Sequence, residues 1–201
     1  MAYDIIPDRS VVEKTMAALK ANGIDVYFAE DEAAAKAQVH ALIPDGADVM
    51  TMTSRTTDQL GLDAELNESG QYSSLRSRMF SEDTTPQEKR QIGAAADFVT
   101  GSVHAVTENG EVVIASNTGS QLPAYAYAAG TVVWVVGTQK IVPDLEAAKK
   151  RIYEYVLPLE SERAHQAYGV PASFVSKLLI INREVNPHRL KLIFVNKKLG
   201  F

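Results

Sequence analysis

Cysteine is absent from this chain of 201 residues. Without thiols the chain can form no disulfide, no thiol nucleophile and no cysteine-ligated zinc or iron–sulfur site, and their absence fits a reducing compartment. No stretch approaches the roughly 20 consecutive apolar residues of a membrane span. The N-terminal segment carries Asp4, Asp8 and Arg9 and lacks the apolar run of a secretory signal. We therefore expect a cytoplasmic protein with no membrane partner.

Basic residues are also fewer than acidic residues. Twenty lysines and arginines stand against 25 aspartates and glutamates, for a formal net charge of −5, and this balance argues against a nucleic-acid partner. The phosphate-binding patterns G-x-G-x-x-G and G-x-x-x-x-G-K-[ST] are missing, as is the G-x-S-x-G nucleophile elbow. The four histidines show no metal-ligand spacing. We expect no cofactor and no metal.

The composition that remains is typical of a globular protein, with 46% hydrophobic and 22% charged residues. A chain of this length buries roughly 70% of its unfolded surface, so its core needs no disulfide or metal. No repeat, low-complexity stretch or linker interrupts it. We expect one domain over residues 1–201.

Strand and helix patterns alternate along the first part of the chain. Ser10 and Glu13 have the spacing of a capping box, and Asp31 is positioned to cap a second helix. The expected elements are a helix over 11–21, a strand over 24–29, a helix over 31–42, a strand over 47–52 and a helix over 54–60. This alternation indicates parallel strands joined by right-handed crossovers.

The second part of the chain adds an antiparallel element. Asn109-Gly110 separates two β-rich runs, 98–107 and 112–115, which is a strong hairpin signal. Residues 67–80 are expected to be mostly loop, and the other expected elements are helices over 85–96 and 145–155, a short helix after 120, and strands over 131–136, 178–181 and 190–195. We predict an α/β fold whose mainly parallel sheet carries an inserted antiparallel hairpin and C-terminal strands.

Two polar turns between predicted strands and helices are candidate ligand sites. The first contains Ser54, Arg55, Thr56 and Thr57, and the second contains Thr118, Gly119, Ser120 and Gln121. Loops at the carboxyl ends of parallel strands are where such folds collect ligands, and hydroxyls, a guanidinium and free backbone N–H groups favour an anion. Helix capping alone is the alternative for both turns. We expect them to form one pocket for a small carboxylate or phosphate.

Other polar residues are weaker candidates. Lys140 follows the 131–136 strand and is expected near the rim of the pocket, whereas Glu108 at the hairpin tip could serve as a catalytic carboxylate or as a solvated turn residue. His104 is expected to be a structural histidine. The basic residues near the C-terminus are expected to be solvated, namely Arg163, Lys177, Arg183 and Arg189.

Four blocks of sequence resemble the LUD (lactate utilisation) domain family, particularly its short stand-alone members. They are MTSRTTDQLGL (52–62), ADFVTGSVHAVTENGEVVIASNTGSQ (96–121), VVWVVGTQKIVPDLEAAKKRI (132–152) and RLKLIFVNKKLGF (189–201). The resemblance implies a three-layer, Rossmann-like fold similar to sugar-phosphate isomerases, CoA transferases and 5-formyltetrahydrofolate cyclo-ligases. In that superfamily, loops corresponding to 54–57 and 118–121 commonly bind phosphate or carboxylate.

The chain departs from the family pattern at two places. Relatives have an asparagine–arginine pair where this chain has Ser120-Gln121, which weakens the inference of a charged ligand. Some short relatives have a cysteine-rich segment where this chain has residues 164–184 without cysteine, so no metal role carries over.

The resemblance implies a small-anion-binding protein associated with the oxidation of lactate or a similar small hydroxy acid, and the sequence leaves open whether it is an enzyme. Redox chemistry would require a partner protein, because the chain has no cysteine ligands and no flavin or nicotinamide motif. One alternative is a non-catalytic subunit that docks on an iron–sulfur oxidoreductase. Another is an ATP-dependent ligase or transferase of the cyclo-ligase type, with Glu108 as its carboxylate. A homodimer formed through the C-terminal strands is also left open.

Overall fold

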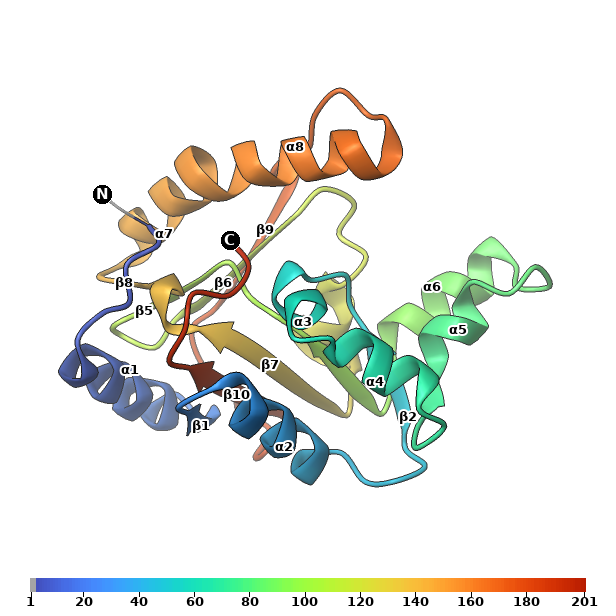
Figure 1. Ribbon diagram of the computed structural model, residues 1–201, viewed down its shortest axis with the longest axis horizontal. Coiled ribbons are helices and arrows are strands. Elements are labelled where there is room, and N and C mark those ends of the chain that lie inside the picture. Colours follow the sequence, from blue (N-terminus) through green and yellow to red (C-terminus); the bar gives the residue numbers. More distant parts are fainter. Residues whose placement is uncertain (1–2) are drawn as a thin grey trace.

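The computed structural model describes residues 3–201 and contains two β-sheets (Figure 1). Residues 1 and 2, part of the expected domain, lie outside the described range. The main sheet has six strands, all paired in parallel. In spatial order they are β1 (Asp25–Ala29), β10 (Leu190–Val195), β7 (Thr131–Gly137), β4 (Phe98–Gly101), β2 (Asp48–Thr51) and β3 (Ser73–Ser74). The predicted α/β class with a mainly parallel sheet is confirmed.

The hairpin belongs to a separate, four-stranded sheet, which corrects the expectation that it is inserted in the main sheet. The order of this sheet is β8 (Ile141–Val142), β5 (Ala105–Thr107), β6 (Val112–Ser116) and β9 (Lys177–Ile181). The run 98–107 is not one strand, because the chain leaves the main sheet after Gly101 and starts β5 at Ala105. The turn at Asn109-Gly110 is confirmed, with Gly110 at φ 84°. Of the two C-terminal strands, only β10 joins the main sheet.

Alternating side chains of the central strand β7 define the layers. Val133 and Val135 pack with α2 (Glu32–Leu42) and α4 (Leu62–Glu68) on one face. Trp134 and Val136 pack on the other face with α1 (Arg9–Ala21) and the hairpin strands. A third apolar cluster joins the second sheet to α7 (Leu145–Arg151). Because β7 is covered on both faces, its sequence is a continuous apolar run.

The remaining helices correct several predicted boundaries. Residues 67–80 are not mostly loop, since they contain the end of α4, strand β3 and α5 (Leu75–Met79), whose cap is Ser74. The helix expected to end near 155 continues through a π-helical turn, η3 (Ile152–Val156), into α8 (Leu157–Tyr168). The other elements are α3 (Arg55–Gln59), α6 (Pro86–Ala94), a π-helical turn η1 (Ala124–Ala128) and a 3-10 turn η2 (Thr138–Lys140).

The first helix starts earlier than its sequence pattern suggests. Asp8 is the N-cap of α1, and Arg9 is its first residue. Glu13 bonds to Arg9 at 3.0 Å instead of forming the expected capping box with Ser10. The predicted capping box is therefore wrong: Ser10 and Glu13 have the required spacing, but Ser10 lies inside the helix and not at its N-cap.

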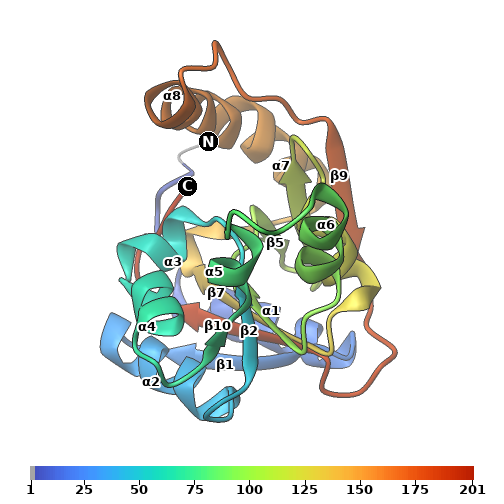
Figure 2. The same ribbon diagram turned by 90° about the vertical axis from the view of Figure 1, so that its right-hand side faces the viewer.

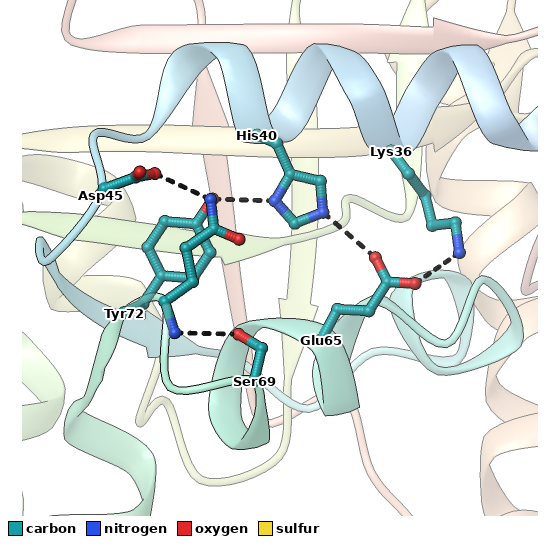
Figure 3. Close-up of polar contacts among 7 residues, drawn as sticks. Lys36, His40, Asp45, Glu65, Ser69 and Tyr72 are labelled. Carbon is teal, nitrogen blue, oxygen red and sulfur yellow. Dashed lines mark hydrogen bonds and ion pairs between the residues drawn. The ribbon is translucent and has the colours of Figure 1, made fainter.

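A polar network on the outer side of the main sheet fastens α2 to α4 (Figure 3). His40 bonds through Nδ1 to the Tyr72 hydroxyl at 2.8 Å and through Nε2 to Glu65 at 3.1 Å. Lys36 pairs with the second oxygen of Glu65 at 2.5 Å. All four residues are absent from the lining of the large cavity described below, so we assign them a structural role. Within the described residues, the helices are too short or too polar to cross a bilayer.

Candidate functional site

A cavity of about 1040 Å³ lies where the two sheets meet. In Figure 2, α8 lies above α3, α5 and α6. All four helices contribute residues to the wall of the cavity. Both polar turns singled out from the sequence reach this wall, through Ser54, Arg55, Thr56, Thr118, Gly119, Ser120 and Gln121. The structure therefore brings together two turns that are more than 60 positions apart in the chain.

The turn after β2 is held by local hydrogen bonds. Ser54 caps α3 by accepting a hydrogen bond from the Thr57 N–H at 3.4 Å. Thr57 is fully buried, donates its hydroxyl to the Ser54 carbonyl at 3.2 Å and does not line the cavity. Arg55 is 43% exposed and pairs with Asp58. Since α3 has only five residues, the attraction for an anion must come mainly from side-chain charge.

The turn after β6 is ordered by its own side chains. Gly119 has φ 86° and donates its N–H to the Ser116 hydroxyl at 2.9 Å. Ser116 donates in turn to the Gln121 side-chain oxygen at 2.9 Å, while Thr118 donates to Ser120 at 3.1 Å. The backbone angle favours glycine at position 119, and a Cβ there would lie 2.6 Å from a carbon of the Lys177 side chain, which would have to move.

Lys140 lies deeper than the rim position expected from the sequence, since its side chain lines the cavity but the residue is only 2% exposed. Its Nζ donates to Thr56 Oγ1 at 3.0 Å, to Ser102 Oγ at 3.2 Å and to the Val103 carbonyl at 3.1 Å. No carboxylate of the described residues is within ion-pair distance. Burial, together with the nearby Arg151, lowers the pKa of Lys140 well below its ordinary value.

His104, which also lines the cavity, and Arg151, which does not, extend this basic group. Arg151 is fully buried and donates to the His104 carbonyl, and burial lowers its pKa to about 10. The His104 ring accepts the Ala115 N–H at Nδ1, at 3.1 Å, which places the proton of the neutral ring on Nε2. Burial, with Lys140 and Arg151 close by, lowers the pKa of His104 to about 3.

The charge of the wall is strongly positive although the whole chain carries −5. The single acidic side chain in the lining, Glu160, is bonded to Arg163 at 2.6 and 2.7 Å. The basic lining residues are Arg55, Arg76, Lys89, Arg90, Lys140 and Arg163. Four of these were not proposed as site residues, because their contribution depends on α5, α6 and α8 facing the two turns. Such a surface favours an anionic ligand.

Apolar side chains form a large part of the remaining lining, among them Met50, Met79, Phe80, Tyr125 and Phe174. Tyr125 fits because β4 ends in glycine, since a Cβ at Gly101 would lie 2.2 Å from the tyrosine oxygen. Phe80 and Phe174 are each more than 60% exposed. The cavity thus combines cationic groups with an apolar wall, as ligand sites commonly do.

Glu108 lies outside this cavity, which separates it from the other candidate residues. Its carboxylate pairs with Lys14 of α1 at 2.8 Å, and its backbone N–H bonds to the Val142 carbonyl. This placement gives Glu108 a structural role at the hairpin tip and offers no support for a catalytic one.

The low pKa of His104 makes acid stability a direct test of its environment. Between the ordinary pKa of 6.5 and the folded value of about 3, the unfolded chain binds a proton that the folded chain does not. His104 therefore contributes stability that is complete above pH 6.5 and is lost as the pH falls toward 3. The slope is at most about 1.4 kcal/mol per pH unit. Urea unfolding at pH 7.5, 6, 5 and 4 measures it.

The His104→Asn variant is the matched control, since an asparagine oxygen can accept the Ala115 N–H but does not titrate. We expect this variant to lose less stability than the parent between pH 6.5 and 4. Parallel acid profiles for the two proteins would contradict the assigned environment.

Comparison with known proteins shows the family of the chain and a solved structure with a similar fold. A family model described as the LUD domain matches residues 12–195, whereas no curated protein matches. A DUF162 family protein from Deinococcus radiodurans is 11% identical, with 93% of this chain and 97% of that chain covered and a TM-score of 0.56, which shows a shared fold.

Two further solved structures are more distant. The beta subunit of eIF2B from Chaetomium thermophilum is 14% identical over 57% of this chain and 40% of that one, with a TM-score of 0.39. Ribose 5-phosphate isomerase from Plasmodium falciparum is 10% identical over 89% and 81%, with a TM-score of 0.32. Neither likeness is high enough to support an inference.

Proposed function

Because the chain belongs to the LUD-domain family, we propose that its cavity binds a small molecule through a carboxylate or phosphate group. The observation that carries this proposal is the positive lining, in which six basic residues face one carboxylate that is already paired. Arg55 and Arg163 already have carboxylate partners, whereas the other four basic residues form no ion pair within the described residues. A half-buried cation without a counterion is costly, and an anionic ligand would remove that cost. The anion is expected to lie between Arg55, the 118–121 turn and Lys140.

The family resemblance connects this anion with the oxidation of lactate or a similar small hydroxy acid. Such a molecule occupies only part of 1040 Å³, a volume at the upper end of drug-sized ligand pockets. The remaining apolar wall would accept a second substrate or a larger group joined to the same anion. Electron transfer would come from a partner protein, since the chain has no cysteine to ligate a cluster.

The cavity size favours, as a second candidate, a transferase or ligase that binds a nucleotide or an acyl carrier. Glu108 is not its carboxylate under this proposal, because that residue lies outside the cavity. The third alternative, a non-catalytic subunit, would use exposed aromatic residues such as Phe80 and Phe174, but these also line the cavity and are accounted for by a ligand.

A thermal-shift panel tests ligand binding and separates the candidates. The panel contains lactate, glycolate, a sugar phosphate, CoA, ATP and a folate. A ligand at 100 times its dissociation constant stabilises the fold by about 2.7 kcal/mol. We expect Arg55→Ala to weaken binding of the active anion by about 10- to 100-fold, the range of a charge-assisted hydrogen bond.

The matched control is Arg78→Ala, which removes the same charge from an exposed position of α5 outside the cavity lining. Binding should be unchanged in this variant. If no anion in the panel stabilises the protein, or if the two variants lose binding equally, the proposed site is wrong.

A further inference from the structure

The Nζ of Lys140 forms hydrogen bonds only with neutral oxygen atoms among the described residues, which is unusual for a buried lysine. The contacts are two hydroxyls and one carbonyl, from Thr56, Ser102 and Val103, at 3.0–3.2 Å. The charged group that lowers its pKa, in addition to burial, is the cation of Arg151. Lysines that are desolvated beside another cation, without a carboxylate, are the ones that act as amine nucleophiles.

The hydrogen-bond directions accommodate an uncharged amine at this position. Thr56 donates its own proton to the Leu199 carbonyl at 3.3 Å, so it accepts from Lys140, as does the Val103 carbonyl. These two bonds use both N–H groups of a neutral amine. The Ser102 hydroxyl accepts the third hydrogen bond when the amine is charged. It has no other partner among the described residues, so beside an uncharged amine it can turn and donate to the nitrogen lone pair. Burial and Arg151 also lower the pKa of Lys140.

The amine of Lys140 lies in the wall of the cavity that is proposed to bind the anion. Lys140, Ser102 and Thr56 all line the cavity, and Arg55 lines the same wall next to Thr56. A ligand whose carboxylate lies against the cationic wall would therefore bring an adjacent carbon close to Nζ. A 2-oxo acid has its electrophilic carbonyl directly next to its carboxylate, and it is also the product of oxidising a 2-hydroxy acid.

We propose that Lys140 is a nucleophile that forms an imine with the carbonyl carbon of a 2-oxo acid bound in the cavity, an inference that rests on the proposed anion site. The nitrogen lone pair attacks the carbonyl carbon, and the π electrons move to the oxygen, which takes up a proton. The nitrogen gives up its two protons as the oxygen leaves as water and the C=N bond forms. Amine and ketone become imine and water, so no oxidant or reductant is required. Ser102, a half-buried lining residue whose hydroxyl lies 3.2 Å from Nζ, carries the protons.

Reductive trapping tests this step on the full chain. The protein is incubated with pyruvate and sodium cyanoborohydride, which reduces an imine to a stable secondary amine. We expect the intact mass to rise by one reduced pyruvate unit per chain, and peptide mapping to place it on Lys140. Ser102→Ala should slow trapping by about 100-fold, the lower range for a lost proton-transfer group.

Two lysine variants provide the controls. Lys140→Arg places a permanent cation at this position that cannot form an imine, so it should bind the anion and give no adduct. Lys149→Arg changes an exposed lysine of α7 that is not in the cavity lining and should be trapped like the parent. Adducts spread over surface lysines, with Lys140 unmodified in the parent protein, would overturn the inference without relying on any variant.

Thermal shifts with lactate, which has no carbonyl carbon to attack, separate this inference from the proposed function. If lactate or pyruvate stabilises the protein while Lys140 remains unmodified, imine formation is wrong and the anion site stands. If Lys140 is trapped but no other anion binds, the imine stands and the general anion site is wrong. Failure of both measurements removes both proposals.

Discussion

Replacement of Glu184 by alanine is expected to lower the free energy of unfolding by about 3–5 kcal/mol. Its carboxylate bonds to the Arg189 guanidinium at 2.6 and 2.7 Å, and both side chains are less than 10% exposed. Removing the acid leaves a guanidinium buried without a counterion, which costs much more than the loss of a surface ion pair. Glu184 also accepts the backbone N–H groups of Val185 and Asn186, which would lose their partner.

The same pair supports a wall of the cavity. Arg189 donates to the carbonyls of Ala124, Tyr125 and Ala126 in the π-helical turn η1, and this turn holds Tyr125 in the cavity lining. Urea unfolding followed by the emission of Trp134, the one tryptophan of the chain, measures the loss. Weaker binding of an anion is expected alongside it.

Two control variants distinguish the cost of leaving a buried charge unpaired from the cost of losing an ion pair. Glu13→Ala removes an exposed ion pair with Arg9 and should cost less than about 1 kcal/mol. The double variant Glu184→Leu/Arg189→Met removes both charges and should recover much of the stability lost in Glu184→Ala. A loss in Glu184→Ala as small as that in Glu13→Ala would contradict the assigned burial of this pair.

Local patterns were sufficient to predict a mainly parallel sheet and most of its strands. The apolar run of β7 identifies a strand covered on both faces, and the turn after β2 lies at the carboxyl edge of a parallel sheet, where ligand sites gather. The second turn reaches the cavity for another reason. It follows β6 of the smaller sheet, which the chain enters from the main sheet through residues 102–104 between β4 and β5. Hairpin signals alone did not reveal that the chain changes sheets.

The basic residues were harder to predict, because their environment depends on partners far along the chain. Arg189 was expected to be solvated, and this prediction was wrong, since its carbonyl partners lie 63 to 65 positions earlier. Lys140 was expected at the rim, but it is buried against Thr56, 84 positions away. Arg76 lies in a segment whose apolar residues are too sparse to indicate a helix. Sequence spacing reports the faces of single elements and not which elements meet.

Replacement of Trp134 by alanine is expected to cost about 3–5 kcal/mol of stability, the range for deleting a large buried aromatic side chain. Trp134 is in the middle of the central strand β7 and is 0% exposed. Its ring meets that of Tyr125 edge to face, with 5.4 Å between centroids and an angle of 87°. The strand is paired on both sides, so the backbone cannot move in to fill the space.

Trp134→Phe is the matched control, because it keeps an aromatic ring against Tyr125 and leaves a smaller void. It should lose clearly less stability than Trp134→Ala, as measured by far-UV circular dichroism during urea unfolding, since the alanine variant has no tryptophan emission. Equal losses in the two variants would show that the size of the void left beside Tyr125 does not determine the loss of unfolding free energy. Because Tyr125 lines the cavity, its ring should gain freedom only in the alanine variant. The stabilisation produced by a bound anion should then be smaller in Trp134→Ala than in Trp134→Phe, which connects the core of the main sheet to the ligand site.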